Sequence, residues 1–349
     1  DTMVSQVRRR VVDFIGAARP SIADPFLPKK IEEGRLEEIR ECIGCNICYT
    51  GDSLGVPIRC TQNPAIGEEW RRGWHPETIA KKGSESSVLV VGAGPAGLEA
   101  TRALGQRGYR VTLAEATREL GGRVTRESTL PGLGEWLRVR DYRVQQIDAM
   151  SNVEVFRESD LSVDDVLSIE ADHIVISTGA TWRADGFGRN HPQPLTTLSP
   201  SAQILTPDDV MAGRLPDGPT VVFDDDSFYM GGVIAERVCR ENVPVTLVTP
   251  ENVVSDWCEH TSEQYQVQKH LLELGVRIET AHSLLAYDGR EVTICCTHTG
   301  RQQSIEANAL IMVTARSPRD ELYQSLKQRM EGEAQTPFRS LRRIGDCEA

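Results

Sequence analysis

Short, unbroken apolar runs alternate along the chain with stretches whose apolar residues have helical spacing. The first run, residues 88–91, precedes a glycine-rich turn and a helix predicted to end near Arg107. Continuous apolar runs of this length are typical of parallel strands buried on both faces. Further strands are predicted at residues 110–114, 153–156, 173–177, 220–223, 243–248, 276–279, 291–296 and 309–313, with helices from 206, at 232–240 and at 261–274. This alternation predicts an α/β fold with parallel sheets.

The first 80 residues follow a different pattern. Residues 4–12 have the spacing of an amphipathic helix, and a short apolar piece at 13–16 is expected to be a strand. Three prolines within residues 19–28 argue against regular helix there. A short charged helix is predicted over 29–40, and residues 41–80 are expected to form loops around a bound group.

Composition narrows the class of protein. The 349 residues are 39% hydrophobic and 26% charged, with a formal net charge of -12. This acidic balance argues against a nucleic-acid partner, which would require a basic face. No apolar run reaches the ~18–20 residues that span a membrane, and the start lacks the apolar core of a signal peptide. We therefore expect a cytoplasmic protein and, because both ends interrupt an element, a fragment of a longer polypeptide.

Four of the nine cysteines lie close together in the sequence: Cys42, Cys45, Cys48 and Cys60. Two-residue gaps allow three thiolates to surround one iron–sulfur cube, and a following loop can supply the fourth. Gly44 permits the tight turn, while Ile43 and Ile47 can exclude water. A structural zinc is the main alternative, although zinc ligands more often form two separated pairs. The spacing favours a 4Fe-4S cluster over zinc and over uncoordinated thiols.

A dinucleotide-binding fingerprint follows the first predicted strand. Gly92, Gly94 and Gly97 form G-x-G-x-x-G, and Glu115 ends the next strand. The glycines let the backbone approach a pyrophosphate at the helix N-terminus, and the acid accepts from ribose hydroxyls. The positions between and beside these residues complete the predicted site: Pro95, Ala96 and Ala116.

Three later turns are candidates for the same nucleotide site. Each adjoins a predicted strand or helix, and in two-dinucleotide flavoproteins such turns return to the flavin site. Their predicted contact residues are Gly122, Arg123, Thr178, Gly179, Ala180, Gly345 and Asp346. Read alone, each turn is equally well explained as an ordinary connection between a strand and the next element.

A second α/β unit from about residue 206 lacks its own fingerprint. After the strand at 220–223 the chain reads Asp224-Asp225-Asp226-Ser227-Phe228-Tyr229 instead of glycines. Aspartates would repel a pyrophosphate, and the two aromatic rings would fill its space. The next strand ends without an acid for a ribose or a base for a 2′-phosphate. We infer that the fold persists while nicotinamide binding is lost.

Together these features resemble the trimethylamine dehydrogenase family, which includes dimethylamine and histamine dehydrogenases and N-methyl amino-acid demethylases. The resemblance covers essentially the whole chain. It is carried most strongly by residues 18–35, 42–48, 60–77, 91–100, 130–136 and 344–349. Residues 221–232 look most similar to the N-methyl amino-acid demethylase branch.

The resemblance implies a full-length enzyme whose N-terminal (β/α)8 barrel carries FMN and lies mostly outside this chain. An amine or N-methyl amino acid would be oxidatively demethylated, with electrons passing from FMN through the 4Fe-4S cluster to an electron-transfer flavoprotein. Arg19 is placed where the family binds the FMN phosphate. The first nucleotide site would hold FAD, or ADP in its place, in a homo-oligomer that binds no membrane. The catalytic pocket lies outside this sequence.

The predicted organisation is the end of a TIM barrel at 1–40, an iron–sulfur segment at 41–84, and two Rossmann-like, disulfide-reductase-like units. The first unit spans 85–205 and returns at 316–349, and a degenerate NAD(P)-like unit is inserted at 206–315. Two alternatives remain open. One is an NAD(P)H-dependent 2,4-dienoyl-CoA or enoate reductase relative, and the other is a non-catalytic electron-transfer or ADP-binding module.

Overall fold

The computed structural model describes residues 2–332 and 338–348, and it divides into two compact units, 1–79 and 80–349. The first unit is built from short helices joined by loops. They are α1 (Thr2–Arg8), α2 (Ala18–Ala23), α3 (Leu27–Glu32), α4 (Ile47–Leu54) and α5 (Glu69–Arg72), with a 3₁₀ turn at Leu36–Glu38. All the described helices of the chain are too short or too polar to cross a lipid bilayer.

Several predictions for the first unit were wrong, including the expectation of loops at 41–80, where α4 and α5 form. Residues 13–16 form no strand, since the described part of this unit offers no other strand for pairing. The proline-rich stretch contains α2 and the start of α3, because Pro20 and Pro28 lie in first turns, where a missing N–H is tolerated. The charged helix ends at Glu32, before Gly34 adopts a positive φ of 72°.

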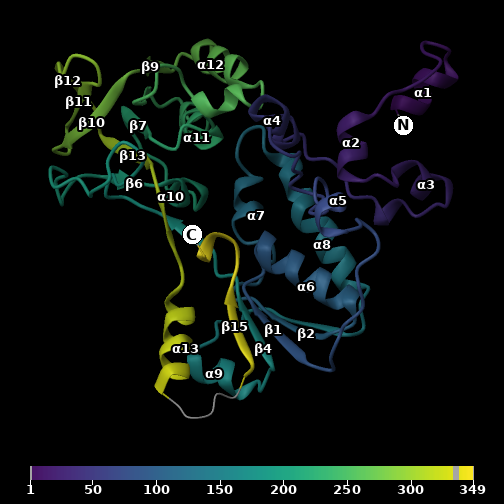
Figure 1. Cartoon of the computed structure of the whole chain (residues 1–349). Helices are drawn as coiled ribbons and strands as arrows, with labels where there is room; N and C mark the ends of the chain where they lie inside the picture. Colours follow the sequence, from purple (N-terminus) through teal and green to yellow (C-terminus); the bar gives the residue numbers. More distant parts are fainter. Residues whose placement is uncertain (1, 333–337, 349) are drawn as a thin grey trace. The chain divides into compact units, whose positions relative to one another are not determined.

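The second unit contains a five-stranded parallel sheet in the order β15-β4-β1-β2-β3 (Figure 1). Its strands are β1 (Ser87–Val91), β2 (Arg110–Ala114), β3 (Val153–Phe156), β4 (His173–Ile176) and β15 (Ser340–Arg343). Helices α6 (Pro95–Arg107), α7 (Arg123–Glu127), α8 (Arg138–Asp148), α9 (Val163–Ser168) and α13 (Glu321–Gly332) belong with it. Strand β15 pairs in parallel with β4, so the chain returns to this sheet near its end.

Both faces of this sheet are covered, which explains the unbroken apolar run in β1. Val88 and Val90 pack with Leu98 of α6 and Ile147 of α8. On the other face Leu89 contacts the group that includes side chains of α9 and α13. Burial on two sides removes the alternation of polar and apolar residues.

A second parallel sheet has the order β6-β13-β7-β8-β9. Its strands are β6 (Ile204–Leu205), β7 (Thr220–Asp224), β8 (Val245–Val248), β9 (Arg277–Glu279) and β13 (Ala309–Val313), with helices α10 (Pro207–Met211), α11 (Tyr229–Cys239) and α12 (Gln264–Glu273). The helices α11 and α12 pack on one face of this parallel sheet. A three-stranded antiparallel sheet packs its buried side chains on the other face; its strands are β10 (His282–Tyr287), β11 (Glu291–Cys296) and β12 (Gln302–Glu306). Helix α10 starts with the predicted capping box of Thr206 and Asp209.

A two-stranded antiparallel ribbon, β5 (Ala180–Trp182) and β14 (Arg316–Pro318), completes the second unit. The α/β fold class with parallel sheets is confirmed. The predicted domain boundaries, including a barrel end at 1–40, stay predictions.

Candidate functional site

The glycine-rich loop between β1 and α6 is held by sterics that only glycine satisfies. Gly92 has a φ of 98°, and a Cβ there would lie 2.5 Å from the Ser177 carbonyl oxygen. A Cβ on Gly97 would lie 1.9 Å from the Gly92 carbonyl oxygen. At Gly94, the residue that caps α6, a Cβ would meet nothing within 4 Å. The loop is therefore closed on its protein side and open at Gly94, where a ligand would approach.

Glu115 stabilises this loop directly. One carboxylate oxygen accepts the Ala93 N–H at 2.8 Å, and the other accepts the Thr117 N–H at 2.9 Å and its hydroxyl at 2.8 Å. Each carboxylate oxygen offers two lone pairs, so the oxygen bound to Ala93 can also accept from a ribose hydroxyl. Ala116, the next residue, is exposed beside it.

The three later turns converge on the glycine loop. A Cβ on Gly122 would lie 3.0 Å from the Gly94 Cα, and one on Gly345 would lie 2.6 Å from the Ala96 Cβ. The Ser177 hydroxyl donates to the Gly92 carbonyl at 2.7 Å. The fold thus brings together segments separated by about 250 residues of chain, as expected where parallel strands end at one sheet edge.

Several predicted contact residues in these turns already have protein partners. Arg123 donates to Asp208 Oδ1 at 2.9 Å and to the Ala180 carbonyl. Asp346 pairs with Arg316 at 2.6 Å, and the Thr178 hydroxyl donates to the Arg319 carbonyl. Gly179 has a φ of 77°, and a Cβ there would meet nothing within 4 Å. Arg123, Thr178 and Asp346 therefore each have a partner within the protein.

The turn after β7 is filled by its own side chains. The Asp224 carboxyl is fully buried and lies against the first turn of α11, since a Cβ on Gly231 would be 2.3 Å from its Cγ. Burial, reinforced by the charge of Asp226, raises the pKa of Asp224 to about 8. The Phe228 ring packs 4.8 Å from Tyr229 and 4.6 Å from Trp257. Helix α11 starts three residues earlier than predicted, and the aromatic residues open it.

The contact between buried Glu127 and half-buried Tyr229 was not predicted from the sequence. The Tyr229 hydroxyl donates to Glu127 Oε2 at 3.2 Å, joining α7 to α11. Burial raises the pKa of Glu127 to about 6, against the lowering effects of Arg123 and the hydrogen bond from Tyr229. The two residues are 102 positions apart, and no sequence pattern pairs them.

We expect Glu127→Gln to raise the free energy of unfolding of the second unit by about 2 kcal/mol at pH 7.5. The carboxyl has a pKa of about 6 when folded and 4.5 as a free side chain. Its ionisation therefore lowers stability progressively between pH 4.5 and pH 6, fully above that range, and has no effect below pH 4.5. Urea unfolding at pH 7.5 and pH 4.5 measures this, with the exposed Glu119→Gln as control. An equal effect at both pH values would contradict the assignment.

The four motif cysteines are half-buried thiols in one segment of the first unit. The Gly44 N–H donates to Cys42 Sγ at 3.4 Å, and the Gln62 N–H donates to Cys60 Sγ at 3.4 Å. Cys45 Sγ lies 3.2 Å from the Thr61 hydroxyl. Burial raises the pKa of the Cys45 and Cys48 thiols, and the other motif cysteines add to both shifts.

Among the described residues, no three His, Cys, Asp or Glu side chains are grouped so that they could hold a metal ion. The chemistry of the four thiols does match an iron–sulfur ligand set, because such clusters are held by four cysteine thiolates. An amide or hydroxyl group lies within hydrogen-bonding distance of three of the sulfurs. Ile43 is buried and Ile47 half-buried beside them. Arg19 is exposed and donates to the Asn46 side chain, so it contacts the cysteine segment. Its role toward an FMN phosphate stays a prediction.

Comparison with known proteins places the chain. Residues 86–210 match the family described as Pyridine nucleotide-disulphide oxidoreductase. Dimethylamine dehydrogenase of Hyphomicrobium sp. (strain x) is 37% identical over 376 residues, covering 100% of this chain and 51% of that protein. The structure of histamine dehydrogenase from Rhizobium sp. 4-9 aligns with a TM-score of 0.98 and 51% identity, covering 100% of this chain and 51% of that one. The chain belongs to the trimethylamine dehydrogenase family.

Membership in this family confirms the resemblance drawn from the motifs. The chain spans about half the length of the relatives it matches. N,N-dimethylglycine/sarcosine dehydrogenase of Chromohalobacter salexigens is 28% identical over 248 residues, 69% of this chain and 34% of that protein. The amino-acid demethylase branch suggested by residues 221–232 stays a prediction.

Proposed function

We propose that this chain is the C-terminal portion of an iron–sulfur flavoprotein that oxidises a small amine, including N-methylated amines, and delivers the electrons to a protein acceptor. Family membership supports the reaction class, because the amine dehydrogenases align over the whole chain. The direction of electron flow is inferred from the turn at the end of β7. Buried Asp224 and Asp225 stand there in place of nucleotide-binding glycines.

Cys42, Cys45, Cys48 and Cys60 would hold the 4Fe-4S cluster. The cluster supplies one-electron transfer between FMN of the preceding barrel and an electron-transfer flavoprotein. The chain's own part is to keep the thiol segment shielded by Ile43 and to donate hydrogen bonds to sulfur from Gly44 and Gln62. Such hydrogen bonds and the exclusion of water set the potential of a cluster.

The first nucleotide site is proposed to hold ADP rather than complete FAD. The glycine loop and Glu115 suit the pyrophosphate and ribose, which both nucleotides contain. A flavin and its ribityl chain would need the groups beyond the pyrophosphate, and those groups are committed to internal contacts. Arg123 is bound to Asp208, and Asp346 to Arg316. The nucleotide would then stabilise the fold without taking part in the redox reaction.

Anaerobic reduction of the full-length enzyme tests the direction of electron flow. We expect a small amine such as dimethylamine or histamine to bleach the flavin absorbance, whereas NADH and NADPH leave it unchanged. The buried side chains of the β7 turn would occupy the space in which a dinucleotide approaches the backbone. Bleaching by NADPH would favour the enoate reductase alternative. A preparation that no amine reduces would favour the non-catalytic module.

A further inference from the structure

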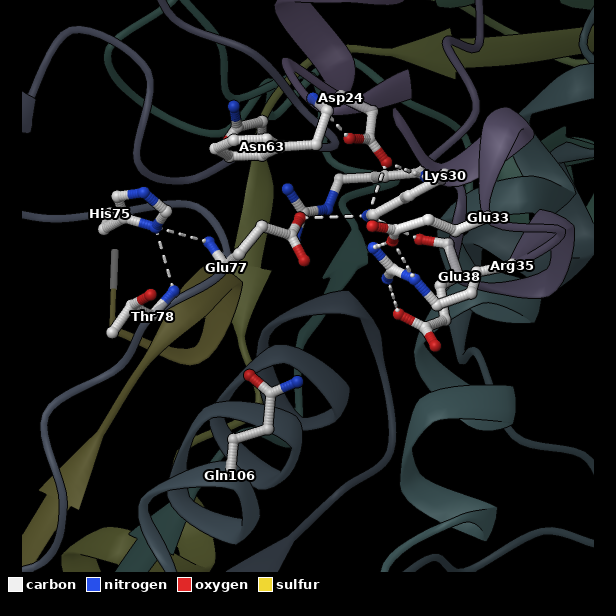
Figure 2. Close-up of polar contacts among 12 residues, drawn as sticks. Asp24, Lys30, Glu33, Arg35, Glu38, Asn63, His75, Glu77, Thr78 and Gln106 are labelled. Atoms are coloured by element: carbon white, nitrogen blue, oxygen red, sulfur yellow. Dashed lines mark hydrogen bonds and ion pairs between the residues drawn. The ribbon is translucent and has the colours of Figure 1, made fainter. Parts of the chain in front are cut away.

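The first unit contains a fully buried lysine that joins three separate segments. Lys30 is 1% exposed, and its ammonium donates to Asp24 Oδ2 at 2.8 Å, the Glu38 carbonyl at 2.8 Å and Glu77 Oε1 at 3.0 Å (Figure 2). An ammonium has three donors, so all of its hydrogen-bonding capacity is used. A charge buried to this extent requires such complete pairing.

Asp24 extends this network toward the cysteine segment. It is fully buried, its Oδ2 also accepts the Arg40 N–H at 2.9 Å, and its Oδ1 accepts the Phe26 N–H at 3.0 Å. Arg40 lies two residues before Cys42. The carboxylate therefore fixes the backbone that leads into the first predicted ligand.

The segment after the last predicted ligand is fixed in the same way. The Gln62 side chain, two residues beyond Cys60, donates to the Glu41 carbonyl at 2.9 Å. Buried Asn63 donates to the Ile22 carbonyl at 3.1 Å and accepts the Ala65 N–H at 3.1 Å. The chain beyond Cys60 is thereby tied to the residue before Cys42 and to helix α2.

A buried ion pair is a weak source of stability, since desolvating two charges offsets their attraction and apolar replacements are often neutral. We infer that Asp24 and Lys30 are positioning residues: they hold the backbone that leads into Cys42, to which the segment after Cys60 is tied through Gln62. The inference rests on the proposed cluster. It adds that a polar network between α2, α3 and the ligand-flanking residues positions the two segments that carry the first and the last predicted ligand.

The test compares Lys30→Met with Lys29→Met in the full-length enzyme purified without oxygen. Lys29 is the adjacent lysine, and its side chain is 63% exposed. Iron and acid-labile sulfide per chain, the reduction potential of the cluster and the thermal unfolding midpoint are measured. We expect Lys30→Met to lose cluster about ten-fold, as when outer partners of metal ligands are removed, and Lys29→Met to match the wild type.

The double variant Asp24→Leu with Lys30→Met separates positioning from stability. It leaves no unpaired charge between the two positions, so we expect the unfolding midpoint to recover while iron content stays low or the potential stays shifted. Recovery of both iron and potential with stability would overturn the inference, as would a Lys30→Met variant with full iron and an unchanged potential. Iron-free wild-type protein would instead refute the cluster proposal itself.

Discussion

Replacing Cys45 with serine in the full-length enzyme is expected to remove the iron–sulfur cluster and to slow electron delivery to a protein acceptor by on the order of 100-fold or more. Cys45 is the central predicted ligand, its thiol is half-buried, and it lies beside Thr61. A serine hydroxyl stays protonated at neutral pH and is a poor substitute for a soft thiolate ligand. Reduction of the flavin by amine should persist, because that step precedes the cluster.

Stopped-flow absorbance separates the two steps, and iron and sulfide analysis reports the cluster. Cys295→Ser is the matched control, because Cys295 is also half-buried but lies on β11, far along the chain from the motif. It should retain iron and acceptor turnover. A Cys45→Ser protein with wild-type iron and turnover, or a wild type loaded with zinc, would refute the assignment of the four cysteines.

The parts of the fold that the sequence predicts well are those governed by local rules. Strands β1, β2 and β3 lie where the sequence pattern places them, and in β1 burial on both faces leaves a continuous apolar signal. The glycine loop is predictable for a related reason. Gly92 and Gly97 must be glycine because a Cβ at either position would clash with the loop itself or with Ser177 at the end of the adjoining strand.

Other features depend on partners that sequence patterns do not reveal. Strands β10 and β12 were missed: β12 has a single apolar residue, Ile305, and the buried Leu284 and Tyr287 of β10 find their partners only in the second sheet. The Glu127–Tyr229 pair and the Lys30 network join residues that are distant in sequence. From the sequence alone a lysine such as Lys30 is expected on the surface, because its three acceptors come from segments that only the fold brings together.

The glycine loop offers a paired prediction in which neighbouring substitutions fail in different ways. Gly97→Ala would place a Cβ 1.9 Å from the Gly92 carbonyl oxygen and 2.5 Å from Ser177 Oγ. Both neighbours belong to the tightly packed strand ends, so neither can move away cheaply. We expect this variant to lower the free energy of unfolding by about 3 kcal/mol and to lose its nucleotide as a consequence.

Gly94→Ala should instead fold normally and still bind the nucleotide poorly. Gly94 has a φ of -69°, which alanine adopts readily, and its Cβ would meet no protein atom within 4 Å. The added methyl group would project into the space where the pyrophosphate approaches the backbone, so we expect about a ten-fold loss of affinity. Thermal unfolding and mass analysis of the nucleotide released from each purified variant distinguish the two failures, with ADP as the expected species from the wild type. Normal nucleotide content in a folded Gly94→Ala protein would mean that the pyrophosphate lies elsewhere, since the open side of this loop is the feature that assigns the site.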